Sequence, residues 1–413
     1  MKKILIIGSG RSGLAADELL SKEAETKIWD DRMDAAGKPD VSEYDELVLS
    51  PGVSINHPMA QKARSLGIKI SGELEEAYEH SPADFIAITG TNGKTTTTAL
   101  LGEIFKAYFD DVRVAGNIGI PVSRVIEGST KNTKMITEVS SFQLETVSEF
   151  KPLVSAILNI TPDHLDRHGS FEGYANCKAR IAENQDESCF FVYNLEDPLC
   201  VKIAENLDKK ENGPKTIPFS SKRMLPFEIK EISIPGDHNM QNALAAAAIA
   251  QCCGIPRDVI LRVIKEFKGV EHRMEFVRNI NGVSYVNDSK GTNPDSTIKA
   301  IEASRAPIIL IAGGYEKGSD YGGLISMFGG RVKHILTIGA TGPRFAEKAI
   351  ELGFGRDKIT ACSDMADCVS KAHALAKSGD TVLLSPASAS WDMYKNFEER
   401  GDDFKALVNK ISG

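Results

Sequence analysis

The sequence predicts an α/β protein of three domains, each with a mostly parallel sheet. Short apolar runs that read as strands alternate with helical patterns along most of the chain, which is typical of parallel sheets covered by helices. Two glycine-rich turns each follow such a run and precede a helix. At 413 residues the chain is also longer than one ordinary hydrophobic core requires.

Composition excludes several classes of function. Hydrophobic residues make up 42% and charged residues 26% of the chain, as in a soluble globular protein. The net charge is −8 and no basic run occurs, so we expect no nucleic-acid partner. Seven scattered cysteines without a C-x-x-C motif indicate reduced thiols. No apolar run approaches the ~20 residues that cross a bilayer. We therefore expect a cytoplasmic monomer without a membrane span.

The first domain, residues 1–80, contains a complete G-x-G-x-x-G turn at Gly8–Gly13. Asp30 and Asp31 follow about twenty residues later, at the end of the second predicted strand. This Rossmann-like pattern favours NAD binding and binding of another nucleotide diphosphate about equally, because both place phosphates at the helix N-terminus. The predicted elements are strands at 3–7, 27–29 and 47–49 and helices at 12–20 and 57–66.

The second domain, residues 81–269, begins with a phosphate loop at Gly90–Thr96, between an apolar run and a helix expected over 97–108. Backbone amides of such a loop surround phosphates, Lys94 would neutralise the β and γ oxygens, and the Thr95 hydroxyl would bind Mg²⁺. The strict pattern G-x-x-x-x-G-K-[ST] fails at Ile88, so this loop is a shifted variant. The pattern predicts a central domain of the P-loop ATPase type.

Three further groups in this domain carry candidate chemistry. Glu138 ends an apolar strand of the phosphate-loop sheet and is a natural Mg²⁺ ligand. Asp163, His164, Asp166 and His168 follow another strand, where contact with a metal or substrate is expected. Lys178 lies in a predicted helix, and its own pattern indicates only a solvated lysine. The remaining elements are strands at 111–115, 135–139, 154–160 and 189–193, loops and short strands over 207–230, and helices at 240–252 and 258–267.

The third domain, residues 270–413, repeats the Rossmann-like alternation, with strands at 283–287, 308–312, 334–338 and 381–384. Polar loops follow three of these strands, at 287–293, near Lys317, and at 385–392. Because carboxyl ends of parallel strands share one edge of a sheet, these loops predict a pocket for a small anionic substrate.

Taken together, these residues resemble the Mur ligases, and the resemblance spans almost the whole chain. The Asp288–Asn293 and Ser385–Ser390 forms are similar to those of members that add D-glutamate to UDP-N-acetylmuramoyl-L-alanine. The matching motifs are Gly90–Thr96, Gly116–Gly119, Glu138 with Ser140–Leu144, Asp163–Arg167, His238-Asn239, Asn242-Ala243, His272-Arg273, Asn287–Asn293, Leu384–Pro386 and Asn396–Glu398.

The resemblance implies an ATP-dependent amide ligase of peptidoglycan precursor synthesis that works through an acyl phosphate. It implies Lys94, Glu138, His164 and Lys178 as catalytic residues, and two Mg²⁺ ions held by Thr95, Glu138, His164 and a carbamylated Lys178. The implied ATP site comprises Gly90, Thr91, Asn92, Gly93, Lys94, Thr95, Thr96, Asn239, Asn242, Arg273 and Asp288. The UDP-substrate site comprises Arg11, Ser12, Asp30, Arg32, Gly52, Asn117 and His164. The D-glutamate site comprises Lys290, Thr292, Lys317, Ser390 and Phe397.

Three alternatives stay open at this point. Gly8–Gly13 alone would support an NAD-dependent oxidoreductase, and the phosphate loop alone would support a non-catalytic switch protein. A folate polyglutamylating ligase carries a similar phosphate loop, although the 287–293 loop argues against it. Asp31, Gly291, Tyr315-Glu316 and Trp391 depart from the usual family pattern, and these departures leave the strictness for D-glutamate open.

Overall fold

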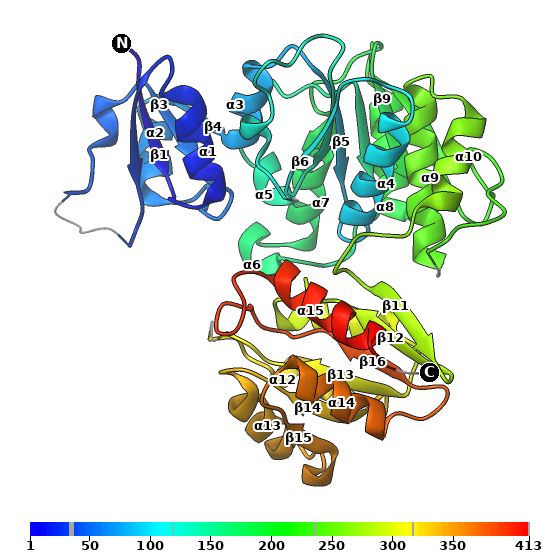
Figure 1. Cartoon of the computed structure of the whole chain (residues 1–413). Helices are drawn as coiled ribbons and strands as arrows, with labels where there is room; N and C mark the ends of the chain where they lie inside the picture. The colour runs from blue at the N-terminus through cyan, green and yellow to red at the C-terminus, as the bar shows by residue number, and fades with distance from the viewer. Residues whose placement is uncertain (33–36, 118, 235–236, 316–317, 412–413) are drawn as a thin grey trace. The chain divides into compact units, whose positions relative to one another are not determined.

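The computed structural model describes residues 1–32, 37–117, 119–234, 237–315 and 318–411. The chain forms two compact units, residues 1–268 and 269–413. Three separate sheets confirm the α/β fold class, two in the first unit and one in the second (Figure 1). The predicted border between domains at residue 80 falls inside the first unit and stays a prediction.

The first sheet is parallel throughout, with strand order β2-β1-β3-β4. Side chains of β1 alternate between two cores: Ile4 and Ile6 pack beneath α1, whereas Leu5 and Ile7 pack beneath α2. The elements are β1 Lys3–Ile7, α1 Arg11–Leu20, β2 Glu25–Trp29, η2 Val41–Glu43, β3 Glu46–Leu49, α2 Pro58–Ser65, β4 Lys69–Gly72 and α3 Glu73–Glu79.

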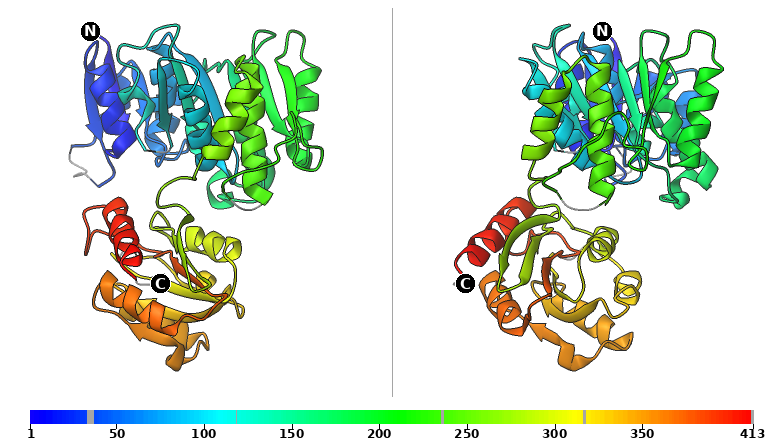
Figure 2. Two further views of the ribbon diagram at one scale, coloured as in Figure 1. Left: turned by 45° about the vertical axis from the view of Figure 1, so that its right-hand side comes forward. Right: turned by 90° about the vertical axis from the view of Figure 1, so that its right-hand side faces the viewer.

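The second sheet is also parallel, with order β10-β9-β8-β5-β7-β6. Helices α4, α9 and α10 pack together on one face, and α5, α7 and α8 lie on the other (Figures 1 and 2). The strands are β5 Asp84–Thr89, β6 Val112–Gly116, β7 Lys134–Glu138, β8 Val154–Ile157, β9 Phe190–Asn194 and β10 Lys215–Phe219. The helices are α4 Lys94–Lys106, η3 Val122–Arg124, α5 Ser141–Leu144, α6 Leu165–His168, α7 Phe171–Ala179, η4 Arg180–Ala182, α8 Pro198–Asp208, α9 Asp237–Cys252 and α10 Arg257–Glu266.

The third sheet makes up the second unit, with order β11-β12-β16-β13-β14-β15, and only β11 runs antiparallel to its neighbour. Helices α14 and α15 pack on one face, and α11, α12 and α13 on the other. The strands are β11 Glu275–Ile280, β12 Val283–Asn287, β13 Ile308–Ala312, β14 Val332–Thr337, β15 Ile359–Ala361 and β16 Thr381–Leu384. The helices are α11 Pro294–Ala303, α12 Gly322–Ser326, α13 Gly342–Glu351, η5 Arg356–Lys358, α14 Met365–Leu375 and α15 Phe397–Asn409.

Helix α4 begins three residues earlier than the sequence predicts. Gly93 caps it with a left-handed backbone (φ 83°), so Lys94 is the first helical residue. The following threonines are poor helix formers in isolation, but Thr95, Thr97 and Thr98 are buried against the second sheet and its helices. Tertiary packing therefore overrides propensity at the position that matters most for the phosphate loop. Within the described residues, no helix is long and apolar enough to cross a membrane.

Candidate active site

The phosphate loop leaves β5 in the middle of the second sheet and turns into α4. A Cβ on Gly93 would collide with the amide oxygen of Asn242 in α9, and a Cβ on Gly90 would lie 3.0 Å from Leu158 Cβ. Both glycines also have positive φ, so larger residues would be strained there. The loop is thus held closely between α9 and β8, with the N-terminus of a thirteen-residue helix at its end. This arrangement suits an anion.

Two lysines converge on one carbonyl of this loop. Lys94 Nζ donates to the carbonyl oxygens of Gly90 (2.8 Å) and Thr91 (2.9 Å). Lys178 Nζ donates to the same Gly90 oxygen at 2.9 Å, and Lys178 is only 1% exposed. Burial, and then the positive charge of Lys94, lower the pKa of Lys178 to about 7. The interpretation of Lys178 as a solvated helix lysine was wrong, because α7 packs this side chain toward Thr89 at the end of β5.

Glu138 lies at the end of β7, next to β5, and is buried. Its Oε1 accepts a hydrogen bond from Asn117 Nδ2 at 2.8 Å. Its Oε2 is buried without a hydrogen-bond partner in the described part of the chain. A buried carboxylate oxygen of this kind is costly unless a cation binds it, so Glu138 fits the predicted Mg²⁺ ligand.

The described residues contain no group of three or more His, Cys, Asp or Glu side chains arranged to hold a metal. The four predicted metal ligands Thr95, Glu138, His164 and Lys178 supply one carboxylate among them. Carbamylation of Lys178 would add a second, anionic oxygen ligand at a position where the unmodified side chain is a cation. The donor set therefore fits Mg²⁺ better with the modification than without it.

A pocket of about 130 Å³ adjoins the phosphate loop and brings together three of the four predicted catalytic residues, Lys94, His164 and Lys178. His164 precedes α6 with a left-handed backbone (φ 50°), and its half-exposed ring lies 4.9 Å from the Phe142 ring. We call this the second pocket. Its lining residues are Lys94, Asn117, Ser140, Ser141, Phe142, Asp163, His164, Tyr174 and Lys178.

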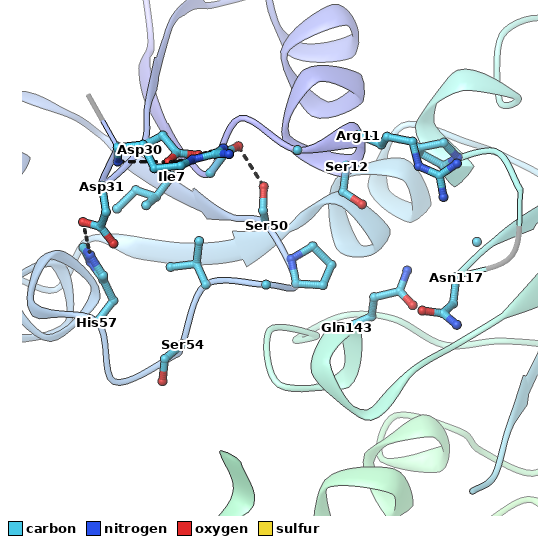
Figure 3. Close-up of a pocket in the computed structure, with 18 of the residues that line it drawn as sticks. Ile7, Arg11, Ser12, Asp30, Asp31, Ser50, Ser54, His57, Asn117 and Gln143 are labelled. Atoms are coloured by element: carbon cyan, nitrogen blue, oxygen red, sulfur yellow. Dashed lines mark hydrogen bonds and ion pairs between the residues drawn. The ribbon is translucent and has the colours of Figure 1, made fainter. Parts of the chain in front are cut away.

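A larger pocket of about 670 Å³ lies between the first and second sheets of the first unit (Figure 3). We call it the first pocket. Six of the seven residues predicted for the UDP-substrate line it, namely Arg11, Ser12, Asp30, Arg32, Gly52 and Asn117. The seventh, His164, lines the second pocket, and Asn117 lines both. The two pockets are therefore neighbours that share one side chain.

The G-x-G-x-x-G turn is explained by packing inside the first sheet. A Cβ on Gly13 would collide with the Gly8 carbonyl oxygen, so this glycine allows α1 to approach β1 closely. Asp30 accepts hydrogen bonds from Ser9 N and Oγ (both 2.8 Å) and from Arg32 Nε (2.7 Å). The Arg32 guanidinium and the Ser9 groups hold the pKa of Asp30 far below its usual range. Both Asp30 oxygens are thus engaged in hydrogen bonds, and those from Ser9 tie the end of β2 to the turn.

Asp31, one of the departures from the family pattern, also has a local partner. Its carboxylate lies 3.2 Å from His57 Nε2, and both residues line the first pocket (Figure 3). Asp31 therefore contributes to the shape of the first pocket without occupying the turn itself.

In the second unit, a buried arginine that the sequence analysis missed holds the polar loops together. Arg400 in α15 is 2% exposed. Its guanidinium donates to Ser289 Oγ (2.9 Å) and O (2.8 Å), and to the carbonyls of Ser388 and Ala389 (both 3.1 Å). Burial lowers the pKa of Arg400 to about 10. The run Phe397-Glu-Glu-Arg is typical of the charged start of a surface helix. Only the position of this helix directly after the 385–392 loop indicates that Arg400 could contact the polar loops.

Asp288 lies in the loop after β12 and is 4% exposed. Its Oδ2 accepts from Ser385 Oγ at 2.7 Å, which joins the loops after β12 and β16. Burial raises the pKa of Asp288 to about 6, although Ser385 and Arg273 oppose the shift. The predicted convergence of polar loops at this sheet edge is therefore present, with Asp288 and Arg400 at its centre.

The residues predicted for D-glutamate follow the same loops. Lys290 Nζ lies 5.8 Å from the Phe397 ring, Thr292 is half-buried and Ser390 is buried. Lys317 lies outside the described residues. The rings of Tyr315 and Trp391 lie 5.5 Å apart, and the two residues are 41% and 60% exposed.

Four residues are predicted to bind ATP outside the phosphate loop, and they are divided between the two units. Asn239 and Asn242 lie in α9, and Asn242 touches the phosphate loop at Gly93. Arg273 and Asp288 belong to the second unit.

Two family models match the chain. The Mur ligase middle domain matches residues 88–250, and the Mur ligase glutamate ligase domain matches residues 272–388. The first match contains the phosphate loop and the second pocket's lysines. The second match contains Asp288 and most of the polar loops of the second unit.

Curated relatives match almost the whole chain. The UDP-N-acetylmuramoylalanine--D-glutamate ligase of Thermoanaerobacter sp. (strain X514) is 44% identical, over 99% of this chain and 98% of the relative. The enzyme of the same name from Clostridioides difficile (strain 630) is 43% identical, over 99% of each chain.

Solved structures show the same fold at low identity. The UDP-N-acetylmuramate-alanine ligase of Thermotoga maritima aligns with a TM-score of 0.58 and 18% identity, over 99% of both chains. The MurF ligase of the same organism, solved in complex with ADP, aligns with a TM-score of 0.56 and 15% identity, over 100% of this chain and 96% of that one.

Proposed function

This chain belongs to the Mur ligases, a family of ATP-dependent peptide ligases, and we propose that it joins D-glutamate to UDP-N-acetylmuramoyl-L-alanine in peptidoglycan precursor synthesis. The observation that carries the proposal is the shared lining of the two pockets. Asn117 lines both and donates to Glu138, so a substrate lying in the first pocket would end beside the phosphate loop. The names of the curated relatives support the choice of substrates.

In the proposed first step, the carboxylate of the UDP-substrate attacks the γ-phosphate of ATP and forms an acyl phosphate. Both reactants are anions, so their repulsion must be reduced before they meet. Lys94, at the N-terminus of α4, would release the Gly90 and Thr91 carbonyls and donate to phosphate oxygens. Mg²⁺ held by Thr95, Glu138, His164 and carbamylated Lys178 would neutralise the charge that develops on the phosphate.

Carbamylation of Lys178 is consistent with its surroundings. Addition of CO₂ requires the neutral amine, and burial together with the Lys94 charge favours that form of Lys178 near neutral pH. The product carries a negative charge beside Lys94, which would replace a repulsion between two cations by an attraction. The modified side chain would therefore be stabilised where the unmodified ammonium is not.

In the proposed second step, the amine of D-glutamate attacks the acyl phosphate and inorganic phosphate leaves. Lys290 and Lys317 would bind the carboxylates of D-glutamate, with Thr292, Ser390 and Phe397 completing the site. Arg400 and Asp288 would keep the loops after β12 and β16 in register for this contact. Positioning of this kind can supply about 7–11 kcal/mol of the barrier reduction when the geometry is good.

The oxidoreductase alternative now has little support, because the family models and the curated relatives that match this chain are those of Mur ligases. The residues of ATP binding, proposed as Gly90–Thr96, Asn239, Asn242, Arg273 and Asp288, would also have no task in such an enzyme.

Phosphate release from ATP tests the proposal. We expect release that requires UDP-N-acetylmuramoyl-L-alanine and D-glutamate together, and that falls by at least a hundredfold in Glu138→Gln, since this variant removes the buried carboxylate charge. Equal release with L-glutamate or L-lysine would contradict the proposed specificity. Phosphate release that does not depend on the UDP-substrate would contradict the proposal that the first pocket binds a substrate of ligation.

A further inference from the structure

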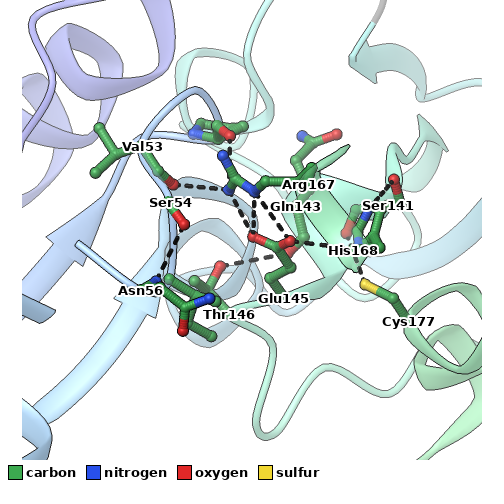
Figure 4. A network of polar contacts seen from close by, with 12 residues as sticks. Val53, Ser54, Asn56, Ser141, Gln143, Glu145, Thr146, Arg167, His168 and Cys177 are labelled. Carbon is green, nitrogen blue, oxygen red and sulfur yellow. Dashed lines mark hydrogen bonds and ion pairs between the residues drawn. The ribbon is translucent and has the colours of Figure 1, made fainter. Parts of the chain in front are cut away.

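We infer that Arg167 is a positioning residue for the UDP-substrate. Residues 50–54 form a loop that makes one wall of the first pocket. Arg167 belongs to α6, the one-turn helix that begins after His164 in the second pocket, and its guanidinium fixes this loop to α6 (Figure 4). The inference rests on the proposed function, and it concerns a residue outside both the phosphate loop and the turn at Gly8–Gly13.

The contacts with the 50–54 loop are made to its backbone. Arg167 Nη2 donates to the carbonyl oxygens of Val53 (2.8 Å) and Pro51 (3.3 Å). These two carbonyls flank Gly52, and all three residues line the first pocket. At the other end of the loop, Ser50 Oγ donates to the Gly8 carbonyl at 2.9 Å. The wall is therefore anchored at two points, and Arg167 is the anchor that comes from the second sheet.

Glu145 holds the same guanidinium in a fixed orientation. Arg167 Nη2 donates to Glu145 Oε2 at 2.6 Å, and Nε donates to Oε1 at 3.1 Å. The two side chains are only 15% and 9% exposed. A fork-like pair that is largely removed from water is stronger and more directional than a surface ion pair.

The Arg167–Glu145 pair also reaches the wall of the second pocket. The guanidinium lies 4.8 Å from the Phe142 ring, which packs against His164. Glu145 Oε1 lies 3.5 Å from His168 Nδ1, and His168 Nε2 lies 3.0 Å from Ser141 Oγ. Displacement of the guanidinium would therefore disturb the wall that holds the UDP end of the substrate and the wall where its carboxylate reacts.

Two other arginines show what a merely structural contact looks like. Arg124 donates two hydrogen bonds to the Glu18 carboxylate (2.7 and 2.8 Å), and this contact also joins a helix of the first sheet to the second domain. The Arg124 side chain is 38% exposed, however, and lines neither pocket. Arg180 donates to the carbonyls of Leu144 and Glu145 (2.7 and 2.9 Å), so it holds the segment of Glu145 from another side. Both arginines bond to segments other than the 50–54 loop, which makes them matched controls.

The test compares Arg167→Lys with Arg124→Lys and Arg180→Lys in the full-length protein. Lysine keeps the charge but lacks the planar fork that contacts both carboxylate oxygens of Glu145 while also donating to the loop carbonyls. We expect Arg167→Lys to raise the KM for UDP-N-acetylmuramoyl-L-alanine and the Kd for UDP about tenfold, which corresponds to about one charge-assisted hydrogen bond. We expect kcat to fall severalfold, while the KM for ATP stays within about twofold.

The controls separate positioning from folding. Arg124→Lys and Arg180→Lys are expected to change the melting temperature without changing the Kd for UDP. Glu145→Gln, a nearly isosteric variant, should raise the Kd in the same direction, and the double variant should cost less than the sum of the two single effects. The inference is overturned if Arg167→Lys and Glu145→Gln both bind UDP within about twofold of the unsubstituted protein, or if Arg180→Lys weakens binding equally.

The measured Kd for UDP and the ligase activity together distinguish a failure of the inference about Arg167 from a failure of the proposed function. If the unsubstituted protein binds UDP but does not ligate D-glutamate, the ligase proposal fails, and the Kd for UDP still tests Arg167. If ligation proceeds normally in Arg167→Lys with an unchanged KM for the UDP-substrate, only the inference about Arg167 fails.

Discussion

Lys178 and Lys94 donate to one carbonyl oxygen, that of Gly90, and both lysines line the second pocket. A shared acceptor brings two cations closer than their charges favour, and the lowered pKa of Lys178 reflects this together with its burial. Such a residue is costly as an unmodified ammonium, and its burial is explained if its working form is an anion.

We predict that Lys178→Ala loses at least a hundredfold in ligase activity and is partly rescued by short carboxylates such as acetate or propionate. The reason is that a small carboxylate can occupy the space of the missing carbamate. Activity would be measured with and without added carboxylate, with chloride at equal ionic strength as the control. No rescue by any short carboxylate would count against the carbamate.

Single residues of the site were predictable to different degrees. Lys94, Glu138 and the 287–293 loop stand at strand ends, where parallel sheets place ligands, so their position along the chain indicates chemistry. Lys178 and Arg400 lie inside helices with ordinary charged neighbours. Their burial depends on which face of α7 or α15 meets the sheet, and a single sequence does not reveal that contact.

Helix α3 shows how an element can be buried despite an acidic sequence. Glu73, Glu75 and Glu76 are all buried. Glu73 accepts from Ser123 N at 2.7 Å and Glu75 accepts from Phe150 N at 3.2 Å, so α3 satisfies backbone groups of the second sheet's segments. Burial, and then the neighbouring Glu46 carboxyl, raise the pKa of Glu76 to about 7.

This shift predicts how Glu76 affects stability as pH changes. An acid whose folded-state pKa is raised favours folding while it stays protonated, and that contribution is lost as pH rises from its unfolded value of 4.5 through about 7. Glu76→Gln should therefore reduce the fall in melting temperature between pH 4.5 and 7, and should be at least as stable as the unsubstituted protein at pH 7.5. Glu103→Gln, at an exposed helical position whose ion pair with Lys106 lies outside this cluster, is the control. A steeper fall in Glu76→Gln would contradict the assignment.

Strands with buried apolar side chains were predictable, whereas one polar strand and one exposed edge strand were not. All of the strands predicted from apolar runs are present, with ends that differ by a few residues. The missed elements include β4, whose sequence is Lys-Ile-Ser-Gly, and the edge strand β11, where Phe276 is 58% exposed. An edge strand or a four-residue strand gains its stability from neighbours, so its own pattern carries little signal.

At the scale of the whole molecule, the first two sheets form one compact unit although the sequence predicts two domains for them. Side-chain contacts such as Arg167 to Val53 and Arg124 to Glu18 join them, and such contacts arise only after folding. The second unit begins at residue 269, and the domain border expected after residue 269 stays a prediction.

Limited proteolysis tests this organisation. Lys268 is exposed at the border, so we expect early tryptic fragments that end at Lys268. Mass spectrometry would identify the fragments, and Lys268→Gln is the control. Early cleavage elsewhere, with this bond intact, would speak against an accessible connection.

The distribution of aromatic residues has a spectroscopic consequence. The chain contains two tryptophans, and each unit holds one of them. Trp29 is 5% exposed and lies 6.2 Å from His57 at the first pocket, whereas Trp391 is 60% exposed beside Tyr315. Their indole emission should therefore differ in wavelength, blue-shifted for Trp29 and red-shifted for Trp391. The protein thus carries two intrinsic fluorophores, which would report separately, without a chemical label, on the site proposed for the nucleotide-sugar and on the site proposed for the amino acid.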